Sequence, residues 1–272
     1  KTQKNYQFVL FMNISIVITA YNKGHLLIDS VDSALNLITD NDEVVIVDDC
    51  STDTESINCI KNLTQKYTSN SNISFYATDV NLGAAGAKNY GINISKGEVI
   101  VLLDADDELV LKSFDIIRDV FSIKDVSFAY GDYIKENLDT GYSENVNCSI
   151  ITDNGYLNPK KVANNWILLG SSPFRKSAFK SLGGYDEFNP VSDDVDLLRK
   201  AIIRGLKFRY IDDTIYKWNV SSSGVNSSYT LESSAFSFFR NAEFFYKYSD
   251  PSKFLLLFIK QIMKLIIIKL RK

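Results

Sequence analysis

The sequence contains very little histidine and cysteine. A single histidine, His25, occurs in 272 residues, which excludes metal sites built from several histidines and most catalytic triads. The three cysteines, Cys50, Cys59 and Cys148, are scattered and odd in number, with neither the spacing of a zinc site nor a disulfide framework. This cysteine usage favours a reducing compartment, so we expect a cytoplasmic protein.

Other familiar signatures are missing as well. No G-x-G-x-x-G follows the first strand-like segment and no G-x-x-x-x-G-K-[ST] occurs, so neither a dinucleotide-binding fold nor a P-loop is supported. No apolar run approaches the ~20 residues of a membrane span, and residues 1–11 lack the apolar core of a secretory signal. The net charge of −3 argues against a nucleic-acid partner, because such proteins are normally basic.

The first half of the chain alternates apolar runs with amphipathic segments. This alternation predicts strands at 14–19, 43–48, 73–77 and 99–103, and helices at 26–38, 53–67 and 84–94. Thr52 and Glu55 have the spacing of a capping box at the start of the second helix. Buried strands separated by helices are typical of a mostly parallel, Rossmann-like sheet flanked by helices, so we predict an α/β fold.

The second half of the chain is less regular. It predicts a helix from after Leu109 to about 121, a strand at 126–134, an irregular region at 135–165, a helix at 194–204 and a short strand at 208–211. A polar loop at 221–229 is a candidate lid over a site.

The last segment, 251–272, has a composition of its own. It carries six basic residues and no acidic one among Phe, Leu and Ile. At about 100° per residue, Lys253, Lys260, Lys264 and Arg271 fall on one stripe of a helix. Such a helix fits the surface of an anionic membrane, and it equally fits packing on the domain or on a second subunit as a homodimer.

Acidic residues follow the expected strands. Asp104, Asp106 and Asp107 come directly after the apolar run at 99–103, and Asp48 and Asp49 end the strand at 43–48. The carboxyl ends of parallel strands share one edge of a sheet, where α/β proteins bind ligands. Carboxylates gathered there are suited to a hard divalent cation, although a solvated turn with helix-capping acids is the alternative for any one cluster.

Six ordered motifs resemble those of glycosyltransferase family 2. They are Ser15-Ile-Val-Ile-Thr-Ala-Tyr-Asn22, Val47-Asp-Asp-Cys-Ser-Thr-Asp53, Asn81-Leu-Gly-Ala-Ala-Gly-Ala-Lys-Asn-Tyr-Gly91, Leu103-Asp-Ala-Asp-Asp107, Gly183-Gly-Tyr-Asp186 and Asp193-Asp-Val-Asp-Leu197. The resemblance implies a GT-A fold, a nucleotide-sugar donor, inversion at the anomeric carbon, and Mn²⁺ or Mg²⁺ as cofactor. It implies a catalytic domain at 12–220, with a nucleotide-binding half at 12–110 and an acceptor-binding half at 111–220. A loop and helical extension at 221–250 and the basic helix would follow.

The resemblance also implies roles for individual residues. The donor-binding set would be Thr19, Ala20, Tyr21, Asn22, Asp48, Asp49, Gly83, Lys88, Asp104, Ala105 and Asp106. Within it, Asp49 or Asp48 would hydrogen-bond the base, and Lys88 would serve the diphosphate or an acid pair near it. Asp104 and Asp106 would hold the metal, and Asp194 would be the general base, with Asp193 and Asp107 as further candidates.

Two positions depart from the family pattern. Cys50 stands where a glycine usually follows the paired aspartates, so the turn there is expected to differ. Asn219 stands near the position of a metal-binding histidine and could supply an oxygen ligand instead.

The resulting hypothesis is a metal-dependent transferase of a sugar, with UDP-sugar as the expected donor. The acceptor would be a saccharide or a lipid-linked saccharide of a bacterial surface polysaccharide, at the inner face of the cell membrane. A nucleotidyltransferase is the second hypothesis, because it also uses a metal at an α/β sheet edge. A non-catalytic relative that binds sugar nucleotides is the third.

Overall fold

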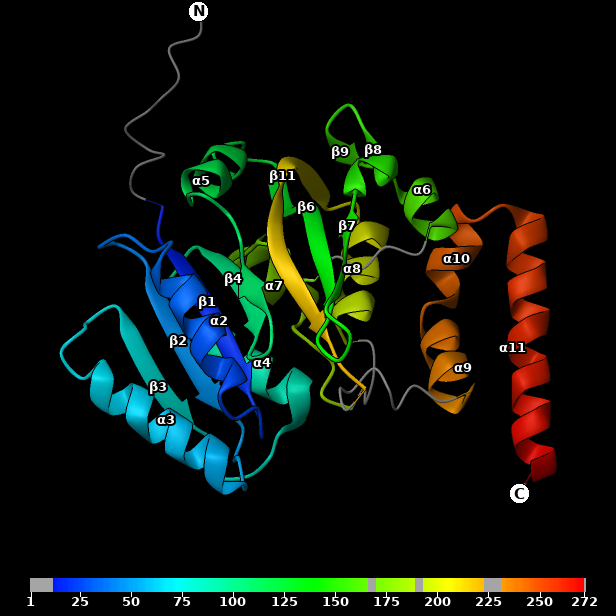
Figure 1. The fold of residues 1–272 in the computed structure, drawn as a ribbon. Helices are drawn as coiled ribbons and strands as arrows, with labels where there is room; N and C mark the ends of the chain where they lie inside the picture. Colours follow the sequence, from blue (N-terminus) through cyan, green and yellow to red (C-terminus); the bar gives the residue numbers. More distant parts are fainter. Residues whose placement is uncertain (1–11, 166–169, 189–192, 223–230, 272) are drawn as a thin grey trace, which may run out of the picture.

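The computed structural model describes residues 12–165, 170–188, 193–222 and 231–271. The first half of the chain forms four strands and three helices in strict alternation (Figure 1). These are β1 (Ile14–Ala20), α2 (Leu26–Leu35), β2 (Glu43–Asp48), α3 (Thr54–Lys66), β3 (Ile73–Ala77), α4 (Gly83–Ile94) and β4 (Val99–Asp104). Every strand and helix predicted for this half is present, with bounds that differ by at most a few residues.

The second half completes the same sheet with shorter elements. They are β5 (Glu108–Leu109), α5 (Asp115–Phe121), β6 (Val126–Asn137), β7 (Tyr142–Val146), the 3₁₀ helix η1 (Cys148–Ile151), β8 (Thr152–Asp153), β9 (Tyr156–Leu157), α6 (Pro159–Asn164), β10 (Phe174–Arg175), α7 (Lys176–Leu182), α8 (Asp193–Ile203) and β11 (Lys207–Val220). The helix predicted to follow Leu109 begins only at Asp115, and Glu108 and Leu109 pair with β11 as a short strand. The predicted lid at 221–229 lies almost wholly outside the described residues.

The described strands form one sheet in the order β3-β2-β1-β4-β10-β6-β11-β9-β8. The first four strands are parallel, whereas β10 runs antiparallel between β4 and β6. β6 and β11 are again parallel to each other. The arrangement is the α/β fold predicted, with a mixed second half.

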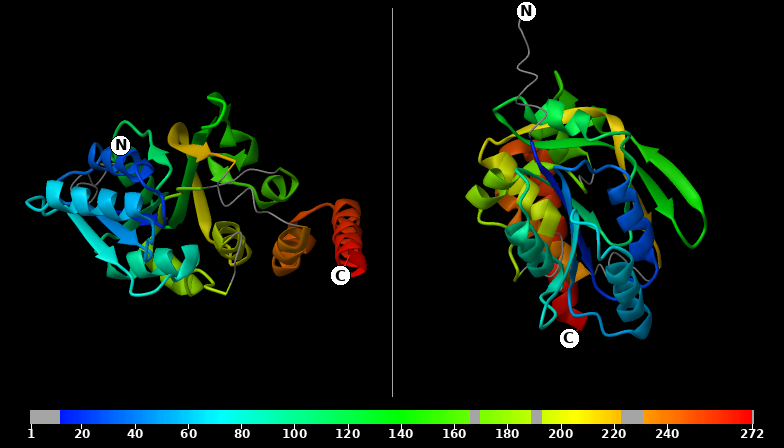
Figure 2. Two further views of the ribbon diagram at one scale, coloured as in Figure 1. Left: turned by 60° about the horizontal axis from the view of Figure 1, so that its bottom comes forward. Right: turned by 90° about the vertical axis from the view of Figure 1, so that its left-hand side faces the viewer.

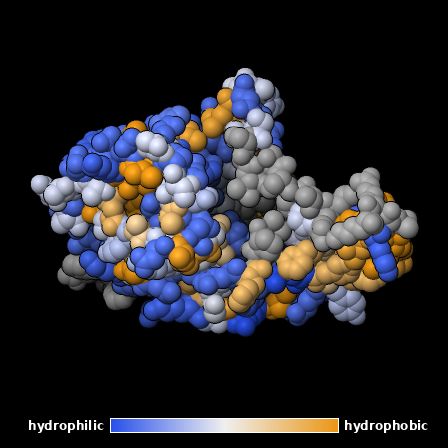
Figure 3. All heavy atoms as spheres, turned by 90° about the horizontal axis from the view of Figure 1, so that it is seen from below, coloured by the Kyte–Doolittle hydropathy of each residue, from blue (hydrophilic) through white to orange (hydrophobic). Residues whose placement is uncertain are grey.

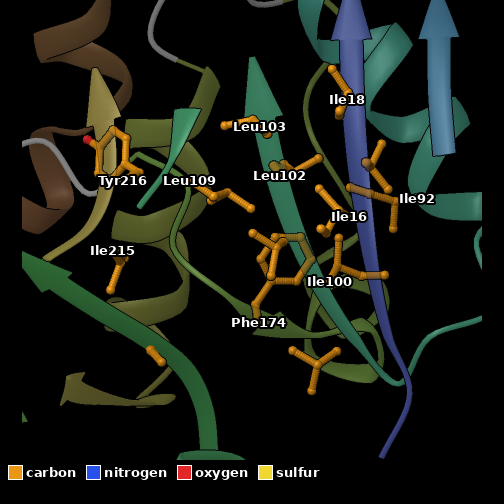
Figure 4. Packing of buried hydrophobic residues seen from close by; sticks show 14 of the residues in the cluster. Ile16, Ile18, Ile92, Ile100, Leu102, Leu103, Leu109, Phe174, Ile215 and Tyr216 are labelled. Atoms are coloured by element: carbon orange, nitrogen blue, oxygen red, sulfur yellow. The ribbon is translucent and has the colours of Figure 1, made fainter. Parts of the chain in front are cut away.

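The core lies between the sheet and its helices. Ile16, Ile18, Ile100 and Phe174 are buried there, from strands far apart in the sequence (Figure 4). Apolar side chains on both faces of the central strands are what a sheet covered on both sides requires.

Helix α4 lies unusually close to β1 and β2. A Cβ atom at Gly91 would lie 2.4 Å from Cγ1 of Val17 and 3.0 Å from Cγ2 of Val47, so only glycine permits this approach. Lys88 lies one turn earlier on the same helix and is carried against the sheet with it.

Three helices follow β11 at the end of the molecule opposite β3 (Figures 1 and 2). They are α9 (Leu231–Arg240), α10 (Ala242–Tyr248) and α11 (Pro251–Arg271). Aromatic side chains join them: the ring centroid of Phe238 is 5.3 Å from that of Phe245 and 6.3 Å from that of Phe254. None of the helices in the described ranges is both long and apolar enough to cross a bilayer.

Candidate active site

The ends of three parallel strands meet at one edge of the sheet. Thr19 pairs with Asp104 of β4, and its neighbour Ala20 pairs with Asp48 of β2. The loop segments that follow these strands are therefore adjacent, as predicted from their position after apolar runs.

The loops after β1 and β2 are tied to each other through Asn22. The side-chain oxygen of Asn22 accepts hydrogen bonds from the backbone N–H groups of Thr52 at 2.8 Å and Asp53 at 3.3 Å. The backbone N–H of Asn22 donates to Oγ of Ser51 at 3.0 Å. Tyr21 is exposed beside this junction, and its ring is open to a ligand.

The two aspartates at the end of β2 have different surroundings. Asp49 is buried, and its carboxylate accepts from the N–H groups of Leu82 at 2.8 Å and Gly83 at 2.9 Å. Asp48 is half-buried and accepts from the N–H of Ser51 at 3.2 Å. Asp49 thus fixes the loop that begins α4, and Asp48 is the aspartate better placed to contact a ligand.

Cys50 keeps the backbone conformation that a glycine would adopt. Its φ is +61°, in the left-handed region. The expectation that the turn as a whole differs from that of the family stays a prediction. A side chain in this conformation carries strain of roughly 1–2 kcal/mol.

The centre of the site is the buried ammonium group of Lys88. Its Nζ lies 3.1 Å from Oδ2 of Asp193, 3.1 Å from Oδ1 of Asp194 and 3.8 Å from Oδ1 of Asp104. Burial alone would lower the pKa of Lys88, but the attraction of these three carboxylates outweighs it and raises the pKa well above its ordinary value. Lys88 is therefore a fixed positive charge between the end of β4 and the start of α8.

Asp194 differs from its neighbour in exposure and titration. Burial raises its pKa to about 6, with Asp193 and Asp104 adding to the rise and Lys88 opposing it. The Asp194 side chain still exposes 40% of its surface, against 14% for Asp193. Asp194 is thus reachable from the cleft and has a pKa in the range of a useful general base.

The acids after β4 are held by two partners. Oδ2 of Asp106 lies 2.5 Å from Nζ of Lys23, from the loop after β1. Oδ1 of Asp107 accepts the backbone N–H of Asn219 at 2.9 Å, and burial raises the pKa of Asp107 well above its ordinary value. The side-chain N–H of Asn219 donates to the carbonyl of Asp106 at 2.7 Å.

The donor atoms fit a hard divalent cation held by few protein ligands. Asp104 and Asp106 would supply carboxylates to such an ion, and the side-chain oxygen of Asn219 is buried with no hydrogen-bond partner. Oxygen ligands of this kind suit Mg²⁺ or Mn²⁺. No group of three or more acidic, histidine or cysteine side chains with metal-site geometry occurs in the described ranges.

A pocket opens beside Lys88. It is lined by Asp104, Asp107, Tyr185 and Asp194 on its polar side and by Leu197 and Phe174 on its apolar side. The pocket joins residues of β4 to residues of α8, and so connects the two groups of acids.

The family model for Glycosyl transferase family 2 matches residues 15–179, more than half of the chain. The chain belongs to this family. It is a family of glycosyltransferases, so the predicted enzyme class is confirmed at the level of the family.

Two curated relatives match over different lengths. The minor teichoic acid biosynthesis protein GgaB of Bacillus subtilis is 27% identical over 84% of this chain and 24% of its own length. The Escherichia coli UDP-Glc:alpha-D-GlcNAc-diphosphoundecaprenol beta-1,3-glucosyltransferase WfaP is 35% identical over 45% of this chain and 47% of its own length. The chain thus spans less than half of either relative.

Two solved structures share the fold. Residues 1–349 of Staphylococcus aureus TarS in complex with UDP-GlcNAc align with a TM-score of 0.63 at 15% identity, over 87% of this chain and 71% of that one. The mannosyltransferase PcManGT of Pyrobaculum calidifontis, solved with GDP-Man and Mn²⁺, aligns with a TM-score of 0.61 at 18% identity, over 85% of this chain and 63% of that one. The predicted GT-A fold is confirmed.

Two features of this family 2 site were missed by the sequence analysis. One is the pairing of Lys23 with Asp106. The other is Arg240 of α9, whose Nε lies 2.8 Å from Oδ2 of Asp196 on α8 and whose guanidinium also contacts Asp186. Neither pairing has a local signal, because the partners are far apart in the sequence.

Proposed function

We propose that the protein transfers a sugar from a nucleotide-sugar donor, UDP-sugar in the first instance, to a hydroxyl group of a saccharide acceptor, with inversion at the anomeric carbon. The observation that carries this proposal is the contact of one buried lysine, Lys88, with acids from both sides of the pocket. Asp104 lies on the side of the strand ends, where the donor diphosphate would bind. Asp194 lies on the other side, where it can serve an acceptor.

In this reaction Asp194 takes the proton of the acceptor hydroxyl group. The acceptor oxygen forms a bond to the anomeric carbon as the bond from that carbon to the diphosphate breaks. The bonding electrons leave with the nucleoside diphosphate. Lys88 keeps Asp193 and Asp194 together at the start of α8, so the base is oriented before the acceptor arrives.

The donor would be held by the ends of β1, β2 and β4. Tyr21 and Asp48 would contact the base, with Thr19, Ala20 and Asn22 shaping that part of the cleft. Asp104, Asp106 and Asn219 would hold a divalent cation, which neutralises charge on the departing diphosphate when bound. The mannosyltransferase solved with Mn²⁺ supports this choice of metal, and the relative named for UDP-Glc supports this choice of donor.

The acceptor we propose is a lipid-linked saccharide used for a bacterial surface polysaccharide. The names of two relatives support it. GgaB is named for teichoic acid biosynthesis, and WfaP is named as a transferase to a diphosphoundecaprenol-linked sugar. The nucleotidyltransferase hypothesis needs a basic nucleotide-binding loop after β1. The 19–23 stretch offers only one basic residue, Lys23, which is too little for such a loop.

A panel of nucleotide sugars tests the donor and the metal together. With Mn²⁺ present, the right donor should raise the melting temperature, because a ligand at 100 times its Kd stabilises by about 2.7 kcal/mol. Asp106→Asn should raise the Mn²⁺ concentration needed for this shift by about tenfold or more, since a charged contact contributes roughly 1.5–3 kcal/mol. Asp40→Asn, an exposed acid outside the site, is the charge-matched control. An unchanged Mn²⁺ requirement in Asp106→Asn would refute the metal assignment.

The pH dependence of kcat/KM tests the base. The pKa of Asp194 is raised from 3.8 to about 6, and only the unprotonated form accepts a proton. The value of kcat/KM should therefore be highest above pH 6 and should fall as the pH drops through about 6. Initial rates across the acid range measure the inflection, and an inflection near 3.8 would contradict the role of Asp194.

A further inference from the structure

Helix α11 has apolar side chains on two opposite faces. One face packs on the domain: Phe254 and Leu257 contact the core, and Gln261 is buried. The ring of Phe258 lies 5.9 Å from that of Phe239 of α9, at the border of this face. The packing alternative for this segment is therefore correct for one face of the helix.

The outer face of α11 is left uncovered. We define it by five side chains with large exposed fractions: Leu255 (57%), Leu256 (69%), Ile259 (50%), Met263 (51%) and Ile266 (45%). They recur at helical spacing and form one continuous stripe. In the space-filling view, apolar atoms gather at the end of the molecule formed by this helix (Figure 3). A contiguous exposed apolar surface of this kind marks an interaction site.

The charge beside the outer face identifies its partner. Lys253, Lys260 and Lys264 run along one flank of the stripe, and the segment 251–272 has six basic residues and no acidic one. The chain as a whole carries −3, so the positive charge is concentrated here. A second copy docked by a two-fold axis would bring this basic segment against itself. An anionic lipid surface complements it.

We infer that the outer face of α11 lies on an anionic phospholipid membrane, parallel to its surface. A helix of 21 residues is about 31 Å long and would insert its apolar side chains among the headgroups, with the lysine flank at the phosphates.

Vesicle co-sedimentation of the full chain tests this inference. The probes are vesicles of phosphatidylcholine alone and of phosphatidylcholine mixed with an equal share of phosphatidylglycerol. The wild-type protein should bind the anionic vesicles, and less strongly at high salt. The triple variant L256S/I259S/M263S should bind them about tenfold or more weakly, because it loses apolar area but no charge.

Two further variants make the test specific. The variant I57S/Y142S/I150S removes three exposed apolar side chains elsewhere on the molecule and should bind like the wild type. The variant K253Q/K260Q should weaken binding to anionic vesicles by about 30-fold at low salt, or about fivefold for each lysine. The donor-induced rise in melting temperature reports folding and donor binding in every variant. A chain that does not bind a nucleotide sugar is therefore recognised independently of its binding to vesicles.

Three results would overturn the inference. They are the absence of binding to anionic vesicles, equal binding by the outer-face variant and the wild type, and a wild-type dimer that dissociates in the outer-face variant. The last result would assign the outer face to a second copy of the chain.

Discussion

Replacing Asp194 by asparagine is expected to lower the rate of sugar transfer by a factor of roughly 10²–10⁴, the usual contribution of general acid–base catalysis. Asparagine has nearly the same shape but cannot accept the acceptor's proton. Lys88 keeps its contacts with Asp193 and Asp104, so the site should stay assembled. Donor-induced stabilisation should therefore be retained, and single-turnover rates with saturating donor measure the loss.

Asp193→Asn is the matched control for this experiment. Asp193 lies at the same distance from Lys88 but is much less exposed than Asp194. We expect it to support the position of Lys88 and to lose less activity on substitution. If Asp193→Asn were inactive and Asp194→Asn active, Asp193 would be the general base and Asp194 the residue that supports Lys88.

Replacing Arg118 by methionine is expected to lower the free energy of unfolding by about 3–5 kcal/mol, the usual effect of breaking a buried ion pair. Arg118 of α5 lies 2.5 Å from Oδ2 of Asp42, and both side chains are buried. Asp42 also accepts the N–H groups of Ile14 and Thr39 at 2.9 Å each. Methionine fills a similar volume but leaves the carboxylate of Asp42 without its positive partner. Urea unfolding followed by circular dichroism measures the change.

Lys207→Met provides the control for Arg118→Met. Lys207 pairs with Asp125 at the surface, where both side chains are more than half exposed. Water and salt screen such a pair, so its loss should change stability very little. Similar midpoints for the two variants would show that the Asp42 carboxylate finds another partner after the loss of Arg118.

The parallel half of the fold could be predicted because its strands are continuous apolar runs. The second half could not be predicted as well, and β11 shows the reason. Its apolar pattern stops after Ile211, so a short strand was expected to end there. The pairing with β6 instead shifts register between Ile211 and Thr214, and the strand then continues to Val220. An irregularity of this kind breaks the alternation on which sequence patterns depend.

The start of α3 shows the same limit at the scale of single residues. Thr52 and Glu55 have capping-box spacing, but Asp53 is the N-cap and accepts the N–H of Ser56 at 2.8 Å. The N–H of Thr52 is instead bonded to Asn22 in the neighbouring loop. Glu55 contacts His25. Contacts with the neighbouring loop thus take the place of the local capping box that the spacing of Thr52 and Glu55 suggested.

In the candidate site, too, local patterns could be predicted and contacts between distant segments could not. The residues at strand ends were identified through motifs, and the parallel register brings them together. The contacts that orient them, such as Lys88 with Asp193, join segments more than a hundred residues apart. Such contacts depend on the whole fold, so no local pattern encodes them.

Arg240 joins the C-terminal helices to the candidate active site. It joins α9 to Asp196, two residues beyond the proposed base, and to Asp186, next to the Tyr185 that lines the pocket. Asn241 also contacts Asp196. A shortened chain ending at residue 220 would keep every family motif but would lose these contacts of Arg240 and Asn241 with α8 and with Asp186. Domain exchange or truncation in this protein should therefore keep residues 12–271 together.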